Sequence, residues 1–307
     1  MKFKKLILAS AVSCALPFSA MAEDLRIGVS MSYFDDNFLT IMRTAMQEEL
    51  AALDGVEAQF EDAKGDVAQQ IQHVESFISQ DLDVIIVNPV DTQAVTPIIR
   101  NALASKAPLL FLGKKPEVPL PEGVPFIGSE SVVAGQLQME YLAEKMGGKG
   151  KLMILLGELN AEATRERTRG VESVVAKYPD IEIVDRQTAK YFRKEAVDVT
   201  SNWILSGHEF DAIASNNDEM AIGAIMALRQ AGKEGVLVGG VDATPDALAF
   251  MDKGMLDVTV FQDAKGQASA AIDTAVKMAK GEKVDQEIMI PFRLVTPDNY
   301  KEFIGMN

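Results

Sequence analysis

Short apolar segments rich in β-branched residues alternate with longer amphipathic segments along nearly the whole chain. Such segments are typical of buried strands and of helices with one apolar face. The predicted strands lie at residues 25–30, 57–61, 84–88, 109–112, 151–156, 181–184, 212–214, 236–240 and 258–261. The predicted helices lie near residues 37–53, 66–80, 92–105, 131–146, 162–178, 193–206, 217–232, 246–253 and 263–280. Apolar strands that alternate with helices form parallel sheets covered on both faces, so we expect an α/β fold with doubly wound sheets.

The second predicted helix illustrates the pattern. Apolar residues recur at three- and four-residue steps from Val67 to Ile78, which places them on one face of a helix. Asp66 precedes them as the predicted N-cap, since its short side chain can accept a hydrogen bond from a free backbone N–H. The segment therefore predicts a helix that packs its apolar face on a sheet.

A proline-rich segment interrupts the alternation near the middle of the chain. Residues 116–125 contain four prolines, which neither a helix nor a central strand tolerates. A chain of 307 residues is also long enough for two domains. We therefore expect one sheet to end near this segment and a second sheet to follow it.

The first residues have the pattern of a secretory signal peptide. Three lysines within residues 1–5 precede an apolar run at 6–16, and Ala20-Met21-Ala22 offers a small-x-small cleavage site. Cleavage after Ala22 would leave 285 of the 307 residues and change the formal charge from −15 to −18. It would also remove Cys14, the only cysteine. A lipoprotein signal ending at Cys14 is an alternative, although Ala11 stands where a larger aliphatic residue is usual. We expect an exported protein in the periplasm.

The net charge excludes some partners. The chain carries 45 acidic residues against 30 basic ones. Proteins that bind nucleic acid draw their affinity from Lys and Arg that neutralise phosphates, and anionic membranes attract basic surfaces for the same reason. The sequence therefore predicts neither a nucleic-acid partner nor binding to an anionic membrane surface.

Motifs for catalysis, metal binding and cofactor binding are missing from the sequence. The two histidines, His73 and His208, fall in or beside predicted helices, far apart in the chain. The segment 147–151 is rich in glycine but lacks the spacing of a phosphate-binding loop. We therefore expect that the protein is not an enzyme and that it binds neither a cofactor nor a metal.

Polar and aromatic residues gather directly after the predicted strands. In open parallel sheets, ligands bind beyond the carboxyl ends of the strands. The residues at these places mix hydroxyls, carboxylates, amides, cations and aromatic rings, which suits a neutral polyhydroxylated ring. Arg165, Arg167 and Arg169 begin one helix, and Arg167 would point away from the other two. At most one or two of these arginines can face a common site.

The order of these segments resembles a known family, the periplasmic sugar-binding proteins of ABC importers with a ribose-binding-like, type I solute-binding fold. The resemblance covers nearly the whole mature chain, and it rests on residues 27–32, 35–38, 84–91, 164–167, Gly170, 187–191, 216–224, 238–242, Gln262 and 294–297. The sequence at residues 187–189, 201–203 and 216–218 is most similar to that of the inositol- and rhizopine-type branch.

The resemblance implies two lobes joined by a three-segment hinge, with the ligand between them. It places hinges near residues 126–129, 261–264 and 288–292. It divides the chain into an N-terminal lobe of residues 23–127 and 263–290 and a C-terminal lobe of residues 128–262 and 291–307. The ligand contacts that it implies, by matching position, are Ser32, Asp36, Phe38, Lys114, Arg165, Tyr191, Asn217, Asp242 and Gln262.

One position departs from the family pattern. The family usually has a carboxylate or amide followed by Arg after the fourth strand, whereas this chain has Gly113 and Lys114. Lys is a single point donor and cannot grip two hydroxyls as the guanidinium fork does. The departure favours a bulkier, differently decorated ring over a simple pentose or hexose. A weakly cationic ring such as an amino-cyclitol would also suit the acidic residues Asp35, Asp36, Glu219 and Asp242.

The resemblance implies a monomeric periplasmic receptor that closes on a sugar or cyclitol and delivers it to a membrane permease. A chemoreceptor or autoinducer-type sugar sensor with the same fold is the alternative that the sequence leaves open. A transcriptional regulator would need a basic DNA-binding domain, and a secreted hydrolase would need a nucleophile and base or a carboxylate pair in the cleft.

Overall fold

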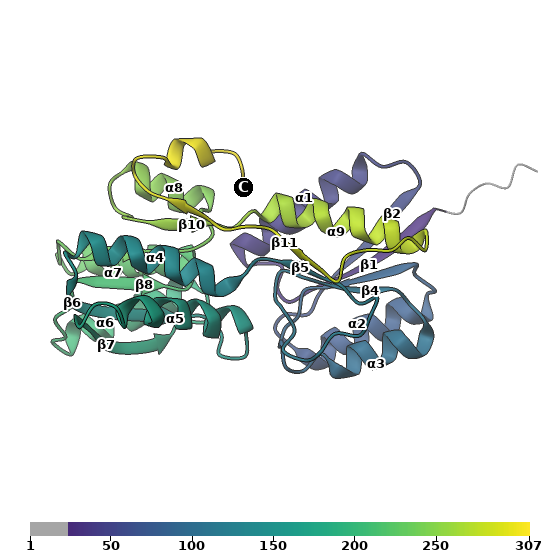
Figure 1. Ribbon diagram of the computed structural model, residues 1–307, viewed down its shortest axis with the longest axis horizontal. Coiled ribbons are helices and arrows are strands. Elements are labelled where there is room, and N and C mark those ends of the chain that lie inside the picture. The colour runs from purple at the N-terminus through teal and green to yellow at the C-terminus, as the bar shows by residue number, and fades with distance from the viewer. Residues whose placement is uncertain (1–23) are drawn as a thin grey trace, which may run out of the picture.

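A computed structural model of the protein describes residues 24–307. It forms two lobes that lie side by side along its long axis (Figure 1). The predicted signal peptide and Cys14 lie outside the described residues. Within residues 24–307, no helix has the length and apolar character needed to span a membrane.

The N-terminal lobe is built on a six-stranded parallel sheet with the order β11-β5-β4-β3-β1-β2. Helices α1 and α9 cover one face of this sheet, and α2 and α3 cover the other (Figure 1). The strands are β1 (Leu25–Met31), β2 (Val56–Asp62), β3 (Val84–Val87), β4 (Leu109–Leu112), β5 (Phe126–Gly128) and β11 (Glu287–Met289). The helices are α1 (Asn37–Ala51), α2 (Val67–Ser79), α3 (Thr96–Ser105) and α9 (Ala264–Ala279).

The C-terminal lobe repeats this layered design with a four-stranded parallel sheet in the order β7-β6-β8-β9. Helices α4 and α5 cover one face, and α6, α7 and α8 cover the other. The strands are β6 (Lys149–Leu156), β7 (Asp180–Thr188), β8 (Ala212–Ser215) and β9 (Leu237–Gly239). The helices are α4 (Ser131–Lys145), α5 (Glu162–Val175), α6 (Arg193–Leu205), α7 (Asp218–Gln230) and α8 (Pro245–Asp252).

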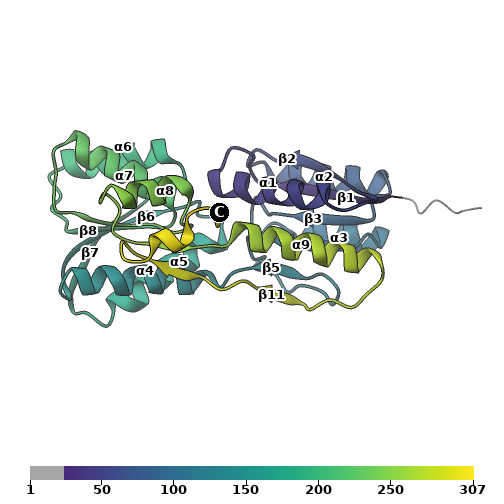
Figure 2. The ribbon, with the colours of Figure 1, turned by 90° about the horizontal axis from the view of Figure 1, so that it is seen from above.

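A two-stranded antiparallel sheet completes the C-terminal lobe. It pairs β10 (Thr259–Phe261) with β12 (Arg293–Val295), and a short 3-10 helix at Tyr300–Phe303 follows. Figure 2, seen from above, places α9 beside α1 in the N-terminal lobe, although β10 directly before α9 belongs to the C-terminal lobe. The chain thus leaves and re-enters each lobe.

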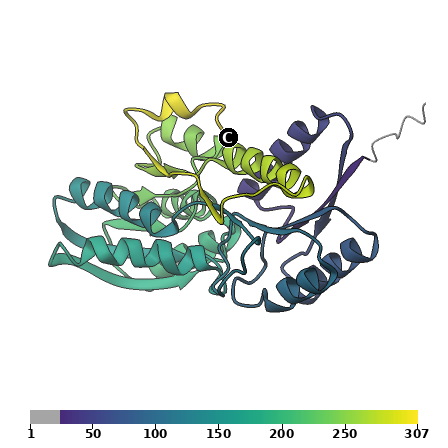
Figure 3. The same cartoon turned by 45° about the vertical axis from the view of Figure 1, so that its right-hand side comes forward.

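The chain crosses between the lobes three times. The crossings lie between β5 and α4, between β10 and α9, and between β11 and β12. Figure 3 shows the last of these, in yellow, as the chain returns from the N-terminal lobe to the C-terminal lobe. The exact residues at which each lobe ends stay a prediction.

The predicted fold class, α/β with parallel doubly wound sheets, is confirmed. Strands β5, β11 and β12 were not among the predicted strands. Each has three residues, which is too short to show a period in the sequence. Strands β9 and β10 are equally short, but they were predicted from the runs of five and four residues at 236–240 and 258–261.

Candidate functional site

A cavity lies between the lobes, at the carboxyl ends of the strands of both sheets. The space inside it that can hold the centres of water-sized molecules is about 60 Å³, so the lobes enclose a narrow cavity. Loops after β1, β3, β4, β6, β7, β8, β9 and β10, with the first turns of α1 and α5, supply the residues that line it. The cavity is therefore at the place where ligands bind in open parallel sheets.

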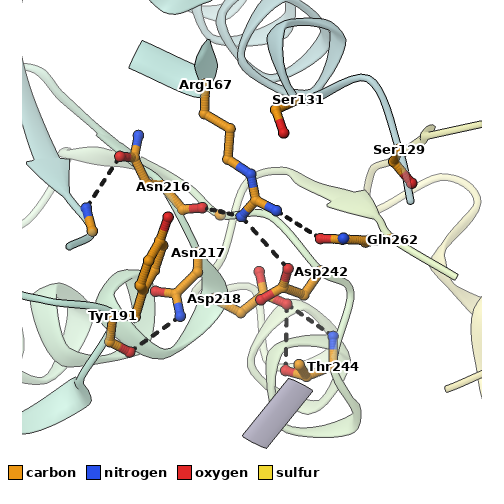
Figure 4. A network of polar contacts seen from close by, with 12 residues as sticks. Ser129, Ser131, Arg167, Tyr191, Asn216, Asn217, Asp218, Asp242, Thr244 and Gln262 are labelled. Atoms are coloured by element: carbon orange, nitrogen blue, oxygen red, sulfur yellow. Dashed lines mark hydrogen bonds and ion pairs between the residues drawn. The ribbon is translucent and has the colours of Figure 1, made fainter. Parts of the chain in front are cut away.

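Arg167 is the central side chain of the C-terminal wall (Figure 4). It projects from α5 and is only 6% exposed. Its Nη1 donates to the carbonyl oxygen of Asn216 at 2.5 Å, and its Nη2 donates to Oε1 of Gln262 at 2.6 Å. Nη1 also lies 3.7 Å from Oδ1 of Asp242. The guanidinium thus ties together the segments after β8, β9 and β10.

Asp242 faces Arg167 from a strained loop. Its φ is 123° and that of Ala243 is 53°, both in the region that side chains avoid. Burial raises the pKa of the Asp242 carboxyl well above its ordinary value, while the Arg167 charge opposes this shift. Strain of this kind persists only where the surroundings impose it, and it is commonly found at binding sites.

Asp218 imposes the shape of this loop. Its carboxylate accepts hydrogen bonds from the Thr259 hydroxyl at 2.6 Å and from the Thr244 N–H at 2.8 Å. Asp218 is fully buried, and burial raises its pKa to about 7. Figure 4 shows the Asp218 carboxylate beside Asp242 and bonded to Thr244, so Asp218 fixes the backbone that carries the cavity-facing carboxylate.

Asn217 and Tyr191 extend the same wall. Asn217 caps α7 through Oδ1, which accepts from the Met220 N–H at 3.0 Å, and its Nδ2 donates to the Tyr191 carbonyl at 3.1 Å. Tyr191 has a φ of 71°, and its hydroxyl lies 2.7 Å from Oγ1 of Thr164. A Cβ at Gly157 would lie 2.1 Å from the Tyr191 ring. Gly157 therefore makes room for this ring.

Lys114 is the main cation of the N-terminal wall. Its Nζ donates to the Ser32 hydroxyl at 3.1 Å, and Ser32 in turn donates to Oδ1 of Asn88 at 2.6 Å. Burial lowers the pKa of Lys114, whereas the carboxylates of Glu158 and Asp36 oppose this shift. Lys114 thus sits on a short chain of hydrogen bonds that starts in the buried sheet.

Asp36 gives this wall its acceptor. One of its oxygens, Oδ1, accepts from the Leu39 N–H at 2.8 Å and caps α1. Burial raises the pKa of Asp36, and the Leu39 N–H and the Lys114 charge oppose this shift. The second carboxylate oxygen is not needed for the cap, so it can accept from a ligand.

Glu158 joins the two walls. It follows β6 in the C-terminal lobe, yet Tyr33 of the N-terminal lobe donates to its Oε1 at 2.7 Å. Its Oε2 lies 3.8 Å from Nζ of Lys114. Tyr33 also packs edge-on against Phe192, with ring centroids 5.9 Å apart. The lobes are therefore in contact across the cleft, and aromatic rings from both of them border the cavity.

A family model for the periplasmic binding protein domain matches residues 27–283. The chain belongs to the periplasmic binding protein family. The predicted resemblance to the ribose-binding-like group is confirmed, because ribose import binding proteins are among the relatives. The one from Escherichia coli is 29% identical, over 96% of this chain and 98% of its own chain.

Two relatives of this periplasmic binding protein are more similar. One, from Rhizobium meliloti, is named "Putative rhizopine-binding protein" and is 45% identical over 99% of this chain and 100% of its own. The other is a solved structure of an ABC transporter solute binding protein from Bacillus halodurans with bound myo-inositol. It is 43% identical, covers 94% of this chain and 100% of its own, and has a TM-score of 0.89.

A third relative, the Caulobacter myo-inositol binding protein solved with myo-inositol, is 27% identical. It covers 91% of this chain and 96% of its own, with a TM-score of 0.86. The predicted similarity to the inositol- and rhizopine-type branch is therefore in line with these relatives.

The structure of this periplasmic binding protein brings most of the predicted contact residues to one cavity. Those that line it are Asp36, Phe38, Lys114, Tyr191, Asn217, Asp242 and Gln262. Ser32 lies behind Lys114 and positions it.

Arg165 does not line the cavity, and Arg167 lies there in its place. Side chains two positions apart in a helix point in directions about 200° apart around its axis, so the two arginines face opposite sides. Arg165 instead contacts Glu117 of the N-terminal lobe.

Several lining residues were not among the predicted contacts. Glu158 follows β6 directly, so the rule for residues after strands could have found it. Phe192 stands next to the predicted Tyr191. Arg167 lies inside α5. The helical period places it on the side opposite Arg165, but the sequence alone does not show which side faces the cavity.

Proposed function

We propose that this chain is the solute-binding receptor of an ABC importer and that it takes one polyhydroxylated ring, an inositol-like cyclitol or a monosaccharide, into the cavity between its lobes. Relatives solved with myo-inositol support this ligand class. The proposed contacts are the cavity-facing side chains Asp36, Lys114, Arg167, Asn217 and Asp242.

The pairing of charges in the cavity carries the proposal. Lys114 lies beside Glu158, and Arg167 lies beside Asp242. Because these cations have anionic partners from the protein, the cavity suits a ligand without net charge. Carboxylates accept from ligand hydroxyls, Lys and Arg donate to them, and Asn217 can do both. The rings of Phe38 and Tyr191 can cover the C–H faces of a ring.

The mechanism is hinge closure without a chemical step. The proposed contacts come from both lobes, so a ligand can make all of them only when the lobes are closed. A ligand stabilises the state to which it binds more tightly, and it therefore shifts the population toward the closed form. The closed form would then be the one that the permease accepts.

Thermal unfolding with a panel of ligands tests the proposal. The panel holds myo-inositol, scyllo-inositol, ribose, galactose, xylitol and glucose, and binding is then measured by calorimetry. A ligand at a hundred times its dissociation constant should stabilise the protein by roughly 2.7 kcal/mol. The proposal predicts a clear shift with at least one cyclitol or sugar. If no member shifts the unfolding midpoint and none releases heat on mixing, the proposed ligand class is wrong.

The cellular setting belongs to the same proposal. We infer export to the periplasm, cleavage after Ala22 and a monomeric receptor. The mass of the exported protein would test the cleavage site, because removal of 22 residues leaves a chain that starts at Glu23. Light scattering would test the monomer.

A further inference from the structure

A second set of contacts joins the lobes outside the cavity, and Arg165 is at its centre. The Arg165 side chain leaves α5 of the C-terminal lobe and reaches the loop between β4 and β5 of the N-terminal lobe. Its Nε donates to Oε1 of Glu117 at 3.2 Å, and its Nη2 donates to the other oxygen of that carboxylate. Nη2 also lies 3.2 Å from Oγ1 of Thr92. The pair has the two-bond geometry that makes arginine–carboxylate contacts strong.

Thr92 connects the same place to the backbone of the C-terminal lobe. Its N–H donates to the Asn160 carbonyl at 3.3 Å, and its Oγ1 accepts from the Glu162 N–H at 3.1 Å. The hydroxyl of Thr92 donates to Oε2 of Glu117 at 2.8 Å. Thr92 and Glu117 are therefore bonded to each other within the N-terminal lobe. Together they contact the first residues of α5 and the loop before it, in the C-terminal lobe.

None of Thr92, Glu117 and Arg165 lines the cavity. The helix turns by about 200° between Arg165 and Arg167. A single helix thus carries one arginine into the cavity and another into a contact between the lobes. The contact can form only when the lobes approach each other, yet it involves no ligand atom.

We propose that Arg165, Glu117 and Thr92 form an interlobe clasp that positions the closed state and raises ligand affinity without touching the ligand. When a ligand binds only the closed form, its apparent dissociation constant equals the intrinsic constant divided by the fraction of protein that is closed. The clasp raises that fraction. The effect of the clasp on ligand affinity rests on the proposed function. Its effect on the separation of the lobes does not, because that separation can be measured without any ligand.

Two substitutions break the clasp from opposite sides. Arg165→Met keeps the length of the side chain and removes its donors, and Glu117→Gln removes the charge on the partner. Arg169→Met is the matched control, because Arg169 lies on the same helix and pairs with Glu166 of the same helix. The double variant Arg165→Met with Glu117→Gln should cost little more than Arg165→Met alone. That single variant already removes the contact with Glu117, together with the bonds of Arg165 to Thr92 and to the Leu159 carbonyl.

The first readout is the distance between the lobes. Leu103 in α3 is 51% exposed and Leu205 in α6 is 84% exposed, so Leu103→Cys and Leu205→Cys, combined with Cys14→Ser, provide one spin-label site in each lobe. Pulsed electron–electron double resonance then reports the distribution of distances in the ligand-free protein. The clasp variants should shift this distribution toward longer distances, whereas Arg169→Met should leave it unchanged.

The second readout is calorimetry with myo-inositol and the sugars and polyols of the panel. The dissociation constant should rise about three- to tenfold in both clasp variants, for every compound that binds the original protein. The order of preference among the compounds should stay the same. A changed order would mean that Arg165 contacts the ligand, and this would overturn the proposal.

The two readouts separate the clasp from the ligand class. If the clasp variants behave as Arg169→Met does in both measurements, there is no clasp. If the distances shift while no compound of the panel binds, the clasp stands and the proposed ligand class is wrong.

Discussion

The C-terminal wall of the cavity is a buried network of hydrogen bonds, whereas the N-terminal wall depends on one lysine and one helix cap. On the C-terminal side, Arg167 binds the segments after three strands, and Asp218 fixes the loop that carries Asp242. On the N-terminal side, Lys114 has one bond to its own lobe, through Ser32, and approaches Glu158 of the other lobe.

This difference indicates separate roles for the walls. Groups that are held in place before binding lose little conformational entropy when a ligand arrives, so the C-terminal wall is suited to orient the ring first. The N-terminal wall acquires its partner Glu158 only when the lobes meet. Its contribution to affinity should therefore depend on closure, and substitutions in the two walls should have different consequences.

Arg167→Met should have the largest effect. It removes the donors to Asn216 and Gln262 and leaves the buried Asp242 without its cation. Breaking a buried pair in this way typically costs about 3–5 kcal/mol. We expect a loss of ligand affinity of about a hundredfold or more and a lower unfolding midpoint, measured by calorimetry and thermal unfolding.

Arg167→Met with Asp242→Asn is the matched variant for this effect. It removes the unpaired charge, so it should recover part of the stability while binding stays lost. If Arg167→Met alone binds the panel as the original protein does, the C-terminal wall does not have the role described here.

Glu162, at the edge where the C-terminal lobe meets Thr92, should make stability depend on pH. Burial raises its pKa to about 7 from an ordinary value of 4.5, while Ser131 and the Arg167 charge oppose the shift. Between these values the folded protein keeps a proton that the unfolded chain has released. Stability therefore falls as pH rises through this window. Glu162→Gln should remove this fall, which amounts to up to about 3 kcal/mol.

Thermal unfolding at about pH 5 and pH 7.5 measures this difference, and Ser131→Ala sharpens it. The Ser131 hydroxyl donates to Oε2 of Glu162 at 3.1 Å and favours the charged form. Its removal should extend the fall in stability to higher pH. An equal pH dependence in Glu162→Gln and the original protein would contradict this assignment.

The sequence predicted the fold more completely than the site. Long apolar strands such as β3 and amphipathic helices such as α2 have a clear period, and the proline-rich segment separates the two sheets. The strands that were missed, β5, β11 and β12, begin or end beside the crossings between the lobes. Their pairing is set by distant segments, and short segments of this kind carry no local signal.

The sequence could indicate which residues after strands line the cavity, for a physical reason. The carboxyl ends of parallel strands lie at one edge of their sheet, so Lys114 after β4 and Asp242 after β9 each lie at that edge of their own lobe's sheet. The two edges face each other across the cavity. The choice between Arg165 and Arg167 depends on how α5 is rotated about its axis. That rotation is set by packing against α4, in which Gly170 lets the two backbones approach closely.

Lys114→Met should weaken binding less than Arg167→Met does. It removes a single point donor and leaves Ser32 and Asn88 bonded to each other. We expect about a tenfold loss of affinity in calorimetry, in the range of one hydrogen bond to a charged group. Lys114→Arg is the sharper variant, because a fork can grip adjacent hydroxyls and should move preference toward pentoses and hexoses. A Lys114→Met loss as large as that of Arg167→Met would mean that the two walls are equivalent.

The smallest effects should come from the one feature that both walls share, a helix cap that also faces the cavity. Asp36 caps α1 through the Leu39 N–H, and Asn217 caps α7 through the Met220 N–H. Replacing a cap by Ala typically costs about 1 kcal/mol, so Asp36→Ala should lower stability by about this amount. Asn217→Ala should cost more, because Nδ2 of Asn217 also holds the Tyr191 carbonyl.

Asp36→Asn separates capping from ligand binding at this position. Its Oδ1 can still accept from the Leu39 N–H, so stability should be kept, while the charge that attracts ligand hydroxyls is lost and affinity falls severalfold. Thermal unfolding and calorimetry on the three variants give both quantities. If Asn217→Ala costs no more stability than Asp36→Ala, then the bond to Tyr191 adds nothing to the C-terminal wall, and the contrast between a prearranged wall and an adaptable one loses one of its supports.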